Sequence, residues 1–476
     1  MDPTRLLFPA LRWRETTGFD HEKERIEATL ARGVGGYIVF GGPAGDVKDL
    51  VGHLQESAPH PLLIGSDLER GAGQQFQGCT SLPPAAALGA LDDLEACYRA
   101  GHTTATEASG LGITWIYAPV ADLGGERLNP IVGTRAFGDD PQRVARAVAA
   151  WIQGCQDAGG LACVKHFPGH GRTSSDSHVA LPVVEADEAT LAEDLVPFAA
   201  AIDIGVGSVM TAHVAYPALD PSGVPATRSR AVIQDLLRGT LRFDGLVVTD
   251  ALVMAAAAFD RSSETSAALE ALDAGVDALL YPRDPIVLSD RLRHAVAAGR
   301  LDAGRVMKSV ERIDRAAQAS PSTTGGWGGH DSWRWALETA RRSLRWLRPP
   351  RDLPLEGGGD LVVVDDDVGG PFPAASRAPF EDALKGAGAV LGSPRAGSHP
   401  WLAVFCDPRG WKGRPGLSPR SVRAVGEIAP EAGLVVLFGH PRLAESIPGD
   451  APLLCAWGGE AIMQEAAADV ALRLHA

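Results

Sequence analysis

Eight short apolar runs recur over residues 5–282 and are separated by segments with a helical pattern. Each run is apolar on both faces, which is typical of a buried parallel strand. The runs are RLLFP (5–9), GYIVFGG (36–42), PLLIGSD (61–67), ITWIYAPVAD (113–122), LACVKHF (161–167), GSVMTAHV (207–214), GLVVTD (245–250) and VDALLYP (276–282). Eight such strands that alternate with helices predict an α/β fold, a (β/α)8 TIM-like barrel.

The segments between the runs supply the helices that such a barrel requires. Apolar residues recur there at helical spacing, and the predicted helices span 22–32, 91–108, 140–157, 189–204, 229–238 and 264–273.

A change of composition follows the predicted barrel. The stretch SPSTTGGWGGH (320–330) is rich in Ser, Thr and Gly, which is typical of a linker, and a helix is expected at 331–347. A second alternation then has apolar runs at 361–367, 401–407, 433–440 and 451–457. We therefore expect a catalytic barrel at 1–320, a linker and connecting helix at 321–357, and a smaller C-terminal α/β layered domain with a parallel sheet at 358–476.

Charge and hydropathy exclude several kinds of partner. The formal net charge is −15, whereas proteins that bind nucleic acid need a basic surface, so no nucleic acid is expected. No run of about 18 apolar residues is present, so no membrane partner is expected. The first 20 residues lack the apolar stretch of a signal peptide, which predicts a cytoplasmic location. No cofactor or metal is expected, and the oligomeric state stays open.

Polar side chains stand directly after several of the apolar runs. In a barrel the active site forms at the carboxyl ends of the strands. Side chains that end successive strands there meet at one rim, so they predict a polar active-site bowl. They are Asp67 with Glu69 and Arg70, Asp122, Lys165 with His166, His213, and Asp250.

The densest cluster of titratable residues is KHFPGHGRTSSDSH (165–178). Loops that are punctuated by Gly and Pro and carry such groups are more often catalytic than structural. Zinc ligation by His166, His170 and His178 is one alternative, but Pro and Gly interrupt the spacing and no HExxH motif is present. Asp176 and His178 project to the same side of an extended segment, so the carboxylate can orient the ring for proton transfer. A local turn bond of Asp176 is equally compatible with the spacing.

Asp250 ends the run GLVVTD and precedes ALVM. An Asp at this place commonly caps the following helix. It also suits a carboxylate nucleophile that attacks C1 of a sugar.

These segments together resemble glycoside hydrolase family 3, specifically its β-N-acetylglucosaminidase branch in the two-domain form. The resemblance rests on GVGGYIVFGG (33–42), PLLIGSDLE (61–69), YAPVADL (117–123), NPIVGTRAFGDDP (129–141), KHFPGHG with DSH (165–178), MTAHVAYPALDP (210–221) and FDGLVVTDAL (243–252). It covers almost the whole predicted barrel, and the KHFPGHG…DSH element is the most specific. A weaker similarity extends to the C-terminal domain.

The resemblance implies an activity and roles for individual residues. It implies a retaining exo-β-N-acetylglucosaminidase acting on carbohydrate with terminal β-GlcNAc. Asp250 is implied as nucleophile and His178 as acid/base, assisted by Asp176. The implied substrate-binding residues are Asp67, Arg135, Lys165 and His166.

Two positions depart from the pattern of relatives. Gln75 stands where a substrate-binding Arg is expected, and Arg172 replaces an Asp or Asn after GHG. A neutral His178 after proton transfer would not repel a phosphate anion, and Arg172 would add attraction. A β-N-acetylglucosaminide or β-glucoside phosphorylase is therefore an alternative, and an inert sugar-binding or scaffold protein is another.

Overall fold

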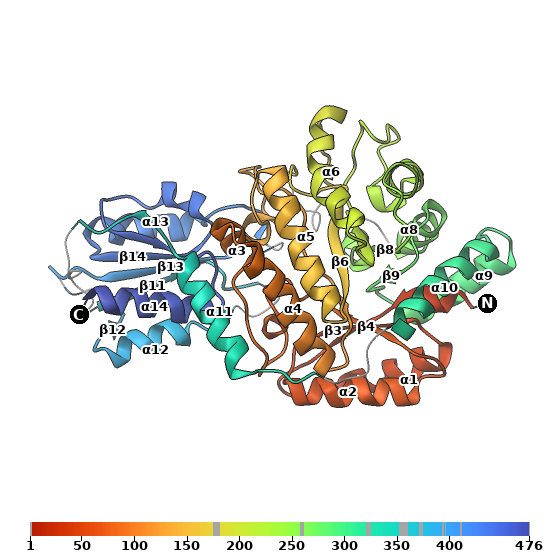
Figure 1. Ribbon diagram of the computed structural model, residues 1–476, viewed down its shortest axis with the longest axis horizontal. Coiled ribbons are helices and arrows are strands. Elements are labelled where there is room, and N and C mark those ends of the chain that lie inside the picture. Colours follow the sequence, from red (N-terminus) through yellow and green to blue (C-terminus); the bar gives the residue numbers. More distant parts are fainter. Residues whose placement is uncertain are drawn as a thin grey trace.

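The computed structural model describes residues 2–174, 181–257, 261–319, 325–351, 360–370, 375–392, 395, 397–409 and 412–475. Figure 1 shows a barrel and a smaller α/β domain that lie side by side along the long axis. The predicted barrel and the predicted second α/β domain are both confirmed. Residues 320–324 and 352–359 lie outside the described residues, so the boundaries at 320 and 358 stay predictions.

All eight apolar runs of the first part form strands in the described part of the chain, and every pairing between them is parallel. The first run contains β1, whereas β2 begins after it, at Ala10, and was not predicted. The ring closes because β1 pairs with β9 and Val248 of β8 bridges to Ala278. The strands are β1 (Leu7–Phe8), β2 (Ala10–Arg12), β3 (Gly36–Phe40), β4 (Leu63–Ser66), β5 (Trp115–Ile116), β6 (Leu161–Phe167), β7 (Ser208–Thr211), β8 (Leu246–Thr249) and β9 (Leu279–Leu280).

Helices cover the outside of the barrel, as Figure 1 shows. Several begin at an Asp whose carboxylate accepts a backbone N–H of the first turn, as Asp93 does for α4 and Asp140 for α5. The predicted helix at 229–238 is a π-helix, Ala231–Thr240. The α-helices are α1 (Lys23–Arg32), α2 (Ala44–Ser57), α3 (Ala85–Leu91), α4 (Leu94–Gly110), α5 (Pro141–Asp157), α6 (Glu188–Asp203), α7 (Leu252–Ala257), α8 (Arg261–Ala274), α9 (Pro285–Ala297) and α10 (Ala303–Ala319). Among the described residues, no helix has the length and apolar character needed to traverse a bilayer.

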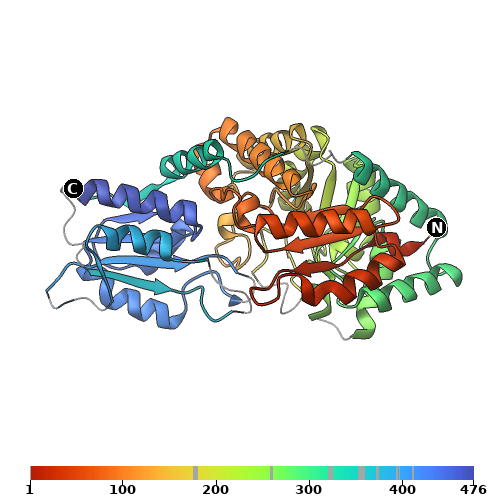
Figure 2. The same cartoon turned by 90° about the horizontal axis from the view of Figure 1, so that it is seen from below.

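The smaller domain is built on a six-stranded sheet in the order β10-β15-β14-β13-β11-β12. Figure 2 shows helices on both faces of this sheet. α12 (Ala378–Gly386) and α14 (Ala461–His475) pack on one face, and α13 (Pro419–Ile428) packs on the other. The strands are β10 (Arg345–Arg348), β11 (Asp360–Asp365), β12 (Val390–Leu391), β13 (Trp401–Cys406), β14 (Leu434–Gly439) and β15 (Leu453–Cys455).

Two predictions about this part are wrong in detail. The helix expected at 331–347 is α11 (His330–Ser343), which ends earlier, and the next residues form β10. β10 pairs antiparallel with β15, so the sheet is mixed rather than parallel. Residues 345–348 form a strand because successive side chains of a strand point to opposite faces of a sheet. Trp346 packs against the core on one face of the sheet, whereas Leu347 packs against the core on the other.

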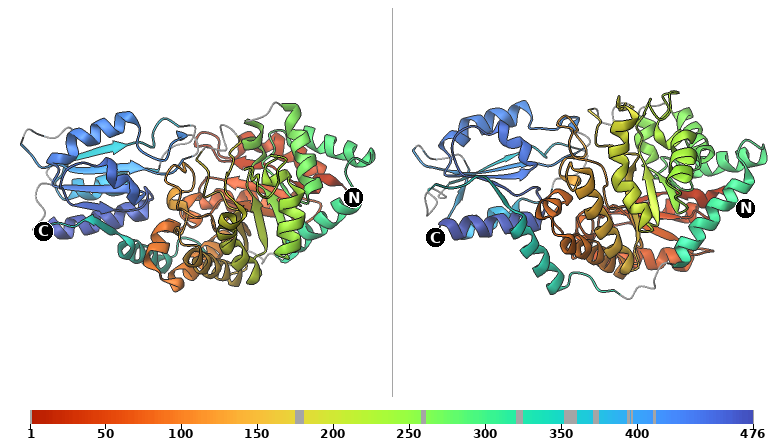
Figure 3. Two further views of the ribbon diagram at one scale, coloured as in Figure 1. Left: turned by 90° about the horizontal axis from the view of Figure 1, so that it is seen from above. Right: turned by 45° about the horizontal axis from the view of Figure 1, so that its top comes forward.

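The carboxyl ends of the two sheets face each other. α11 runs along the junction of the barrel and the smaller domain, as the right-hand view of Figure 3 shows. At the same junction, Arg442 after β14 donates to the carbonyl oxygens of Glu126 and Asn129 in the barrel loop after β5, both at 3.1 Å. The C-terminal domain therefore lies against the rim at which a barrel carries its active site.

Candidate active site

A pocket of about 380 Å³ opens at the carboxyl ends of the barrel strands. This volume is in the range of small-molecule sites. Five of the predicted site residues line it, although they come from separate loops and strands: Asp67, Arg135, Lys165, His166 and Asp250. The other two, Asp176 and His178, lie outside the described residues. The pocket is also lined by Phe40, Glu69, Arg70, Gln74, Gln75, His170, Met254, Tyr281 and Pro408.

A network of ion pairs forms the floor of the pocket. The Nζ atom of Lys165 lies 2.8 Å from Oδ1 of Asp67 and 2.7 Å from Oε1 of Glu69. Arg135 donates from Nε and Nη2 to the two oxygens of Glu69, each at 2.8 Å. This two-point contact fixes the plane of the guanidinium. Glu69 therefore ties together two predicted sugar-binding cations, a role that the sequence pattern did not assign to it.

The charge state of this network follows from its pairing. Burial by itself raises the pKa of Glu69, but Arg135 and Lys165 outweigh it and hold that pKa well below its ordinary value. Burial by itself lowers the pKa of Lys165, but Asp67 and Glu69 outweigh it, so the pKa is raised. Glu69 and Lys165 are therefore ionised at neutral pH, and Lys165 and Arg135 act as hydrogen-bond donors only.

Asp250 follows β8 and its carboxylate faces the same pocket. Its Oδ1 accepts the N–H of Ala251 at 2.7 Å, one residue before α7 begins. Burial by itself raises the pKa of Asp250, but the imidazoles of His166 and His213 outweigh it, so the pKa lies below its ordinary value. A half-buried carboxylate that stays ionised at the end of a barrel strand has the properties of a nucleophile.

Asp122 organises the loop that carries the predicted histidines. It is fully buried behind the pocket, and its Oδ2 lies 2.7 Å from Nδ1 of His166. Its Oδ1 accepts the backbone N–H groups of His166 and His170, at 3.2 and 2.6 Å. Burial by itself raises the pKa of Asp122, but the two imidazoles lower it below its ordinary value. Because an ionised carboxylate only accepts hydrogen bonds, Nδ1 of His166 carries the proton.

The other histidines of the site have structural partners. Nδ1 of His170 lies 2.8 Å from Oγ1 of Thr173, and burial lowers the pKa of His170 to about 4, so the ring is neutral. His213 lies behind Asp250, with its Nδ1 at 2.9 Å from Oγ1 of Thr227. Within the described part of the chain, no group of three or more His, Cys, Asp or Glu side chains is arranged to hold a metal ion.

We expect Asp122→Ala to lower the free energy of unfolding by about 3 kcal/mol. The change leaves two buried N–H groups and an imidazole without their acceptor, and each unsatisfied group costs about 1–3 kcal/mol. Urea unfolding followed by circular dichroism measures the loss. The matched control is Asp203→Ala, because Asp203 is exposed at the end of α6. Equal midpoints for both variants would show that the Asp122 contacts contribute nothing.

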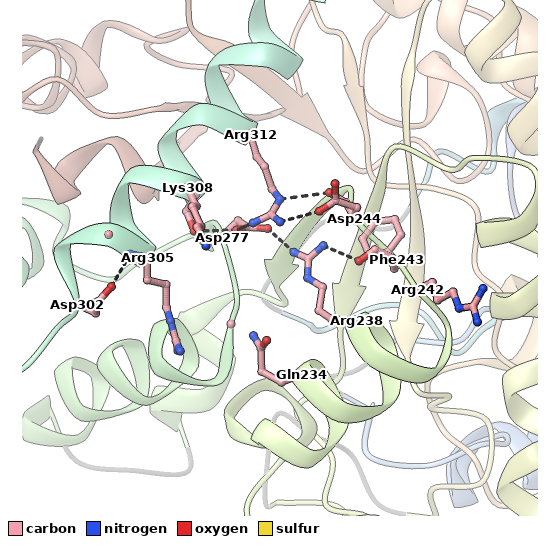
Figure 4. A pocket seen from close by; sticks show the side chains of 13 residues that line it. Gln234, Arg238, Arg242, Phe243, Asp244, Asp277, Asp302, Arg305, Lys308 and Arg312 are labelled. Carbon is pink, nitrogen blue, oxygen red and sulfur yellow. Dashed lines mark hydrogen bonds and ion pairs between the residues drawn. The ribbon is translucent and has the colours of Figure 1, made fainter.

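A larger hollow of about 660 Å³ lies at the opposite end of the barrel (Figure 4). Its charges pair with one another: Asp277 accepts from Arg238 at 2.7 Å and from Arg312 at 3.2 Å, and Arg312 also reaches Asp244 at 2.8 Å. Asp277 precedes β9 and Asp244 precedes β8, so the hollow is at the amino-terminal end of the strands. Polar networks at this end of a barrel serve stability, whereas the pocket at the carboxyl ends of the strands is at the end where barrels carry their active sites.

Comparisons with known proteins identify relatives of this chain. The model of the glycosyl hydrolase family 3 N-terminal domain matches residues 16–316. A β-hexosaminidase of Chromobacterium violaceum is 40% identical over 351 residues, which cover 70% of this chain and 91% of that protein. A β-hexosaminidase of Xylella fastidiosa (strain M23) is 39% identical over 274 residues, which cover 56% of this chain and 80% of that protein.

Two solved structures share the architecture of both domains. A glycoside hydrolase family 3 β-N-acetylglucosaminidase from Paenibacillus sp. str. FPU-7 superposes with a TM-score of 0.85 at 29% identity, covering 100% of this chain and 96% of that one. A β-glucoside phosphorylase superposes with a TM-score of 0.85 at 21% identity, covering 99% of this chain and 91% of that one. The second similarity shows the fold alone.

Proposed function

This chain belongs to glycosyl hydrolase family 3 and is a glycoside hydrolase, and we propose that it removes β-linked N-acetylglucosamine from the non-reducing ends of carbohydrates with retention of configuration. The observation that carries the proposal is the pocket in which the ionised Asp250 faces Asp67, Lys165 and His166. Further support comes from the similarity to β-hexosaminidases and to the β-N-acetylglucosaminidase of Paenibacillus.

The polar floor of the pocket suits a single sugar residue. Asp67 offers carboxylate oxygens to sugar hydroxyls, while Lys165 and Arg135 donate to hydroxyl oxygens. Because Nδ1 of His166 is bound to Asp122, its Nε2 is the ring nitrogen left to form a hydrogen bond with a sugar hydroxyl. In our proposal these four residues hold the non-reducing-end sugar with its C1 toward Asp250.

The reaction then takes two steps. Asp250 attacks C1 while protonated His178 gives its proton to the departing glycosidic oxygen, which forms a glycosyl ester and releases the alcohol. Neutral His178 next takes a proton from water, whose oxygen attacks C1 and frees Asp250. Two displacements at C1 return the β configuration. The proposed role of Asp176 is to accept the ring N–H of His178, which orients the ring for both transfers.

The contacts of Arg172 weaken the phosphorylase alternative. Its Nε donates to Asp194 at 2.7 Å and its Nη2 donates to Glu193 at 3.0 Å, both on α6. Arg172 does not line the pocket described above. Because two carboxylates already pair with Arg172 in the observed conformation, we expect it to add little attraction for phosphate. We propose water as the acceptor.

A panel of nitrophenyl β-glycosides tests the proposed function. We expect nitrophenyl β-N-acetylglucosaminide to be cleaved with the highest kcat/KM, with free sugar as product in the presence and absence of millimolar phosphate. A preference for the glucoside would contradict the proposed substrate. Formation of a sugar 1-phosphate would contradict the proposed acceptor. Binding of N-acetylglucosamine with no turnover of any glycoside would identify a sugar-binding protein instead.

A further inference from the structure

The wall of the pocket contains a residue that the catalytic proposal leaves without a role. Arg70 follows β4 in the rim loop and lines the pocket next to Gln74 and Gln75. Its backbone is fixed, because its N–H donates to Oε1 of Gln74 at 2.8 Å and its carbonyl accepts from Leu82 at 2.9 Å. Nη1 of the guanidinium makes an ion pair with Glu460, while Asp407 and Glu69 are near enough to raise the pKa of Arg70 against the larger effect of burial.

Glu460 belongs to the C-terminal domain, between β15 and α14. Pro408, which follows β13 of the same domain, also lines the pocket. The two domains therefore build one wall of the sugar pocket together, and the ion pair between Arg70 and Glu460 joins them there.

The turn that carries Glu460 is held rigidly. The N–H of Gly459 donates to Oδ1 of Asp407 at 3.1 Å, and Nε2 of Gln464 donates to the carbonyl of Gly459 at 2.8 Å. An ideal Cβ atom at Gly458 would come within 2.3 Å of Oε2 of Glu460, so the carboxylate lies directly against this glycine. The side chain of Glu460 is only 9% exposed. Its position is thus set by the packing of the C-terminal domain and not by solvent.

A cluster of buried charged side chains lies next to this turn. Arg377 donates to Asp365 at 2.9 Å and to Asp367 at 2.7 Å, while Lys412 donates to Asp367 at 2.6 Å. These groups lie where β11 and β13 end, beside Asp407. An ordered charge network beneath a turn fixes the side chains that the turn presents.

Pairing also determines what Arg70 can recognise. A guanidinium has five donors, and one carboxylate engages at most two of them. Glu460, together with the nearby carboxylates of Asp407 and Glu69, balances the positive charge, so the remaining donors suit neutral oxygen atoms rather than a further anion. The sugar hydroxyls and the acetamide carbonyl of N-acetylglucosamine are such acceptors. Arg70 moreover brings a guanidinium to the pocket in which Gln75 stands at the position of an expected Arg.

We infer that Arg70 is a substrate-binding residue and that Glu460 is its positioning residue, so that the C-terminal domain takes part in sugar recognition. This inference rests on the proposed function, because the ligand is the N-acetylglucosaminide named there. Glu460 acts through the ion pair: without it, Arg70 keeps its charge but loses the fixed direction of its donors.

Steady-state kinetics on nitrophenyl β-N-acetylglucosaminide test the inference. We expect Arg70→Gln and Glu460→Gln each to raise KM about 10- to 100-fold, the size of a lost hydrogen bond to a charged group, and to change kcat less than threefold. The double variant should match Arg70→Gln alone, because both changes remove the same contact. Should Glu460→Gln not fold, Glu460→Asp carries the same expectation, since it keeps the charge but shortens the reach.

The matched control is Glu445→Gln. Glu445 pairs with Arg127 across the same domain junction, but both side chains are more than 60% exposed and neither lines the pocket. We expect its KM to equal that of the wild type. An unchanged KM in Arg70→Gln, or in Glu460→Gln, would overturn the inference, as would an equal rise in Glu445→Gln. Failure of the wild type to cleave any β-glycoside would instead overturn the proposed function.

Discussion

Replacing Asp250 by Asn is expected to leave the protein folded and to lower kcat for nitrophenyl β-N-acetylglucosaminide by about 10⁴-fold or more. The amide has the same shape as the carboxylate, so the packing around β8 is retained, but it cannot form the glycosyl ester. Loss of a nucleophile removes a step that no other group in the pocket replaces, which is why the effect is large. Initial rates at saturating substrate measure it.

Turnover, and not stability, separates this role from that of a helix cap. Because Asn caps helices about as well as Asp, a cap function predicts near-normal stability and near-normal turnover for Asp250→Asn. Turnover within tenfold of the wild type would therefore leave Asp250 as a structural residue before α7. The matched control is Asp203→Asn, which changes an exposed carboxylate on α6 and should leave kcat unchanged.

For His178→Ala we expect losses that depend on the leaving group. A nitrophenolate departs with little help from a proton, so formation of the glycosyl-enzyme should slow only mildly. A sugar alcohol needs its proton, so cleavage of a GlcNAc-containing disaccharide should slow by roughly 10²–10⁴-fold, the contribution of a general acid. The comparison uses pre-steady-state bursts on the nitrophenyl substrate and product analysis on the disaccharide.

The ratio of the two losses is the informative quantity. Equal losses on both substrates would contradict an acid role for His178 and would favour a structural role for the loop. Asp176→Ala should show the same dependence on the leaving group to a smaller extent, because it changes the orientation of the ring and not the presence of the proton donor.

The sequence predicted the barrel because each of its strands is buried on both faces. Such strands appear as continuous apolar runs, a pattern that the period of a helix does not explain. Because all strands of the barrel are parallel, the side chain that ends each run lies at the same rim. The amino-acid pattern was therefore sufficient to place Asp67, Lys165, His166 and Asp250 at one site. Their roles needed the resemblance to a family, since the same residue types also serve as caps and core partners.

Contacts between distant residues could not be predicted in the same way. Glu69 was visible beside Asp67, but its two-point contact with Arg135 depends on the loop after β5 folding back over the pocket. Arg70 and Glu460 are 390 positions apart and meet only because the carboxyl ends of both sheets face each other. β10 was missed because its four residues, RWLR, continue the apolar spacing of α11, and only pairing with β15 makes them a strand.

Capture of the glycosyl-enzyme tests the proposed mechanism most directly. A 5-fluoro-N-acetylglucosaminyl fluoride forms the ester quickly, because fluoride leaves well, and releases it slowly, because the second fluorine disfavours positive charge at C1. Peptide mass spectrometry of the trapped protein should find the added sugar on Asp250 and on no other carboxylate. A sugar on Asp67 or Glu69, or a protein that turns over with α product and no adduct, would contradict a retaining mechanism through Asp250.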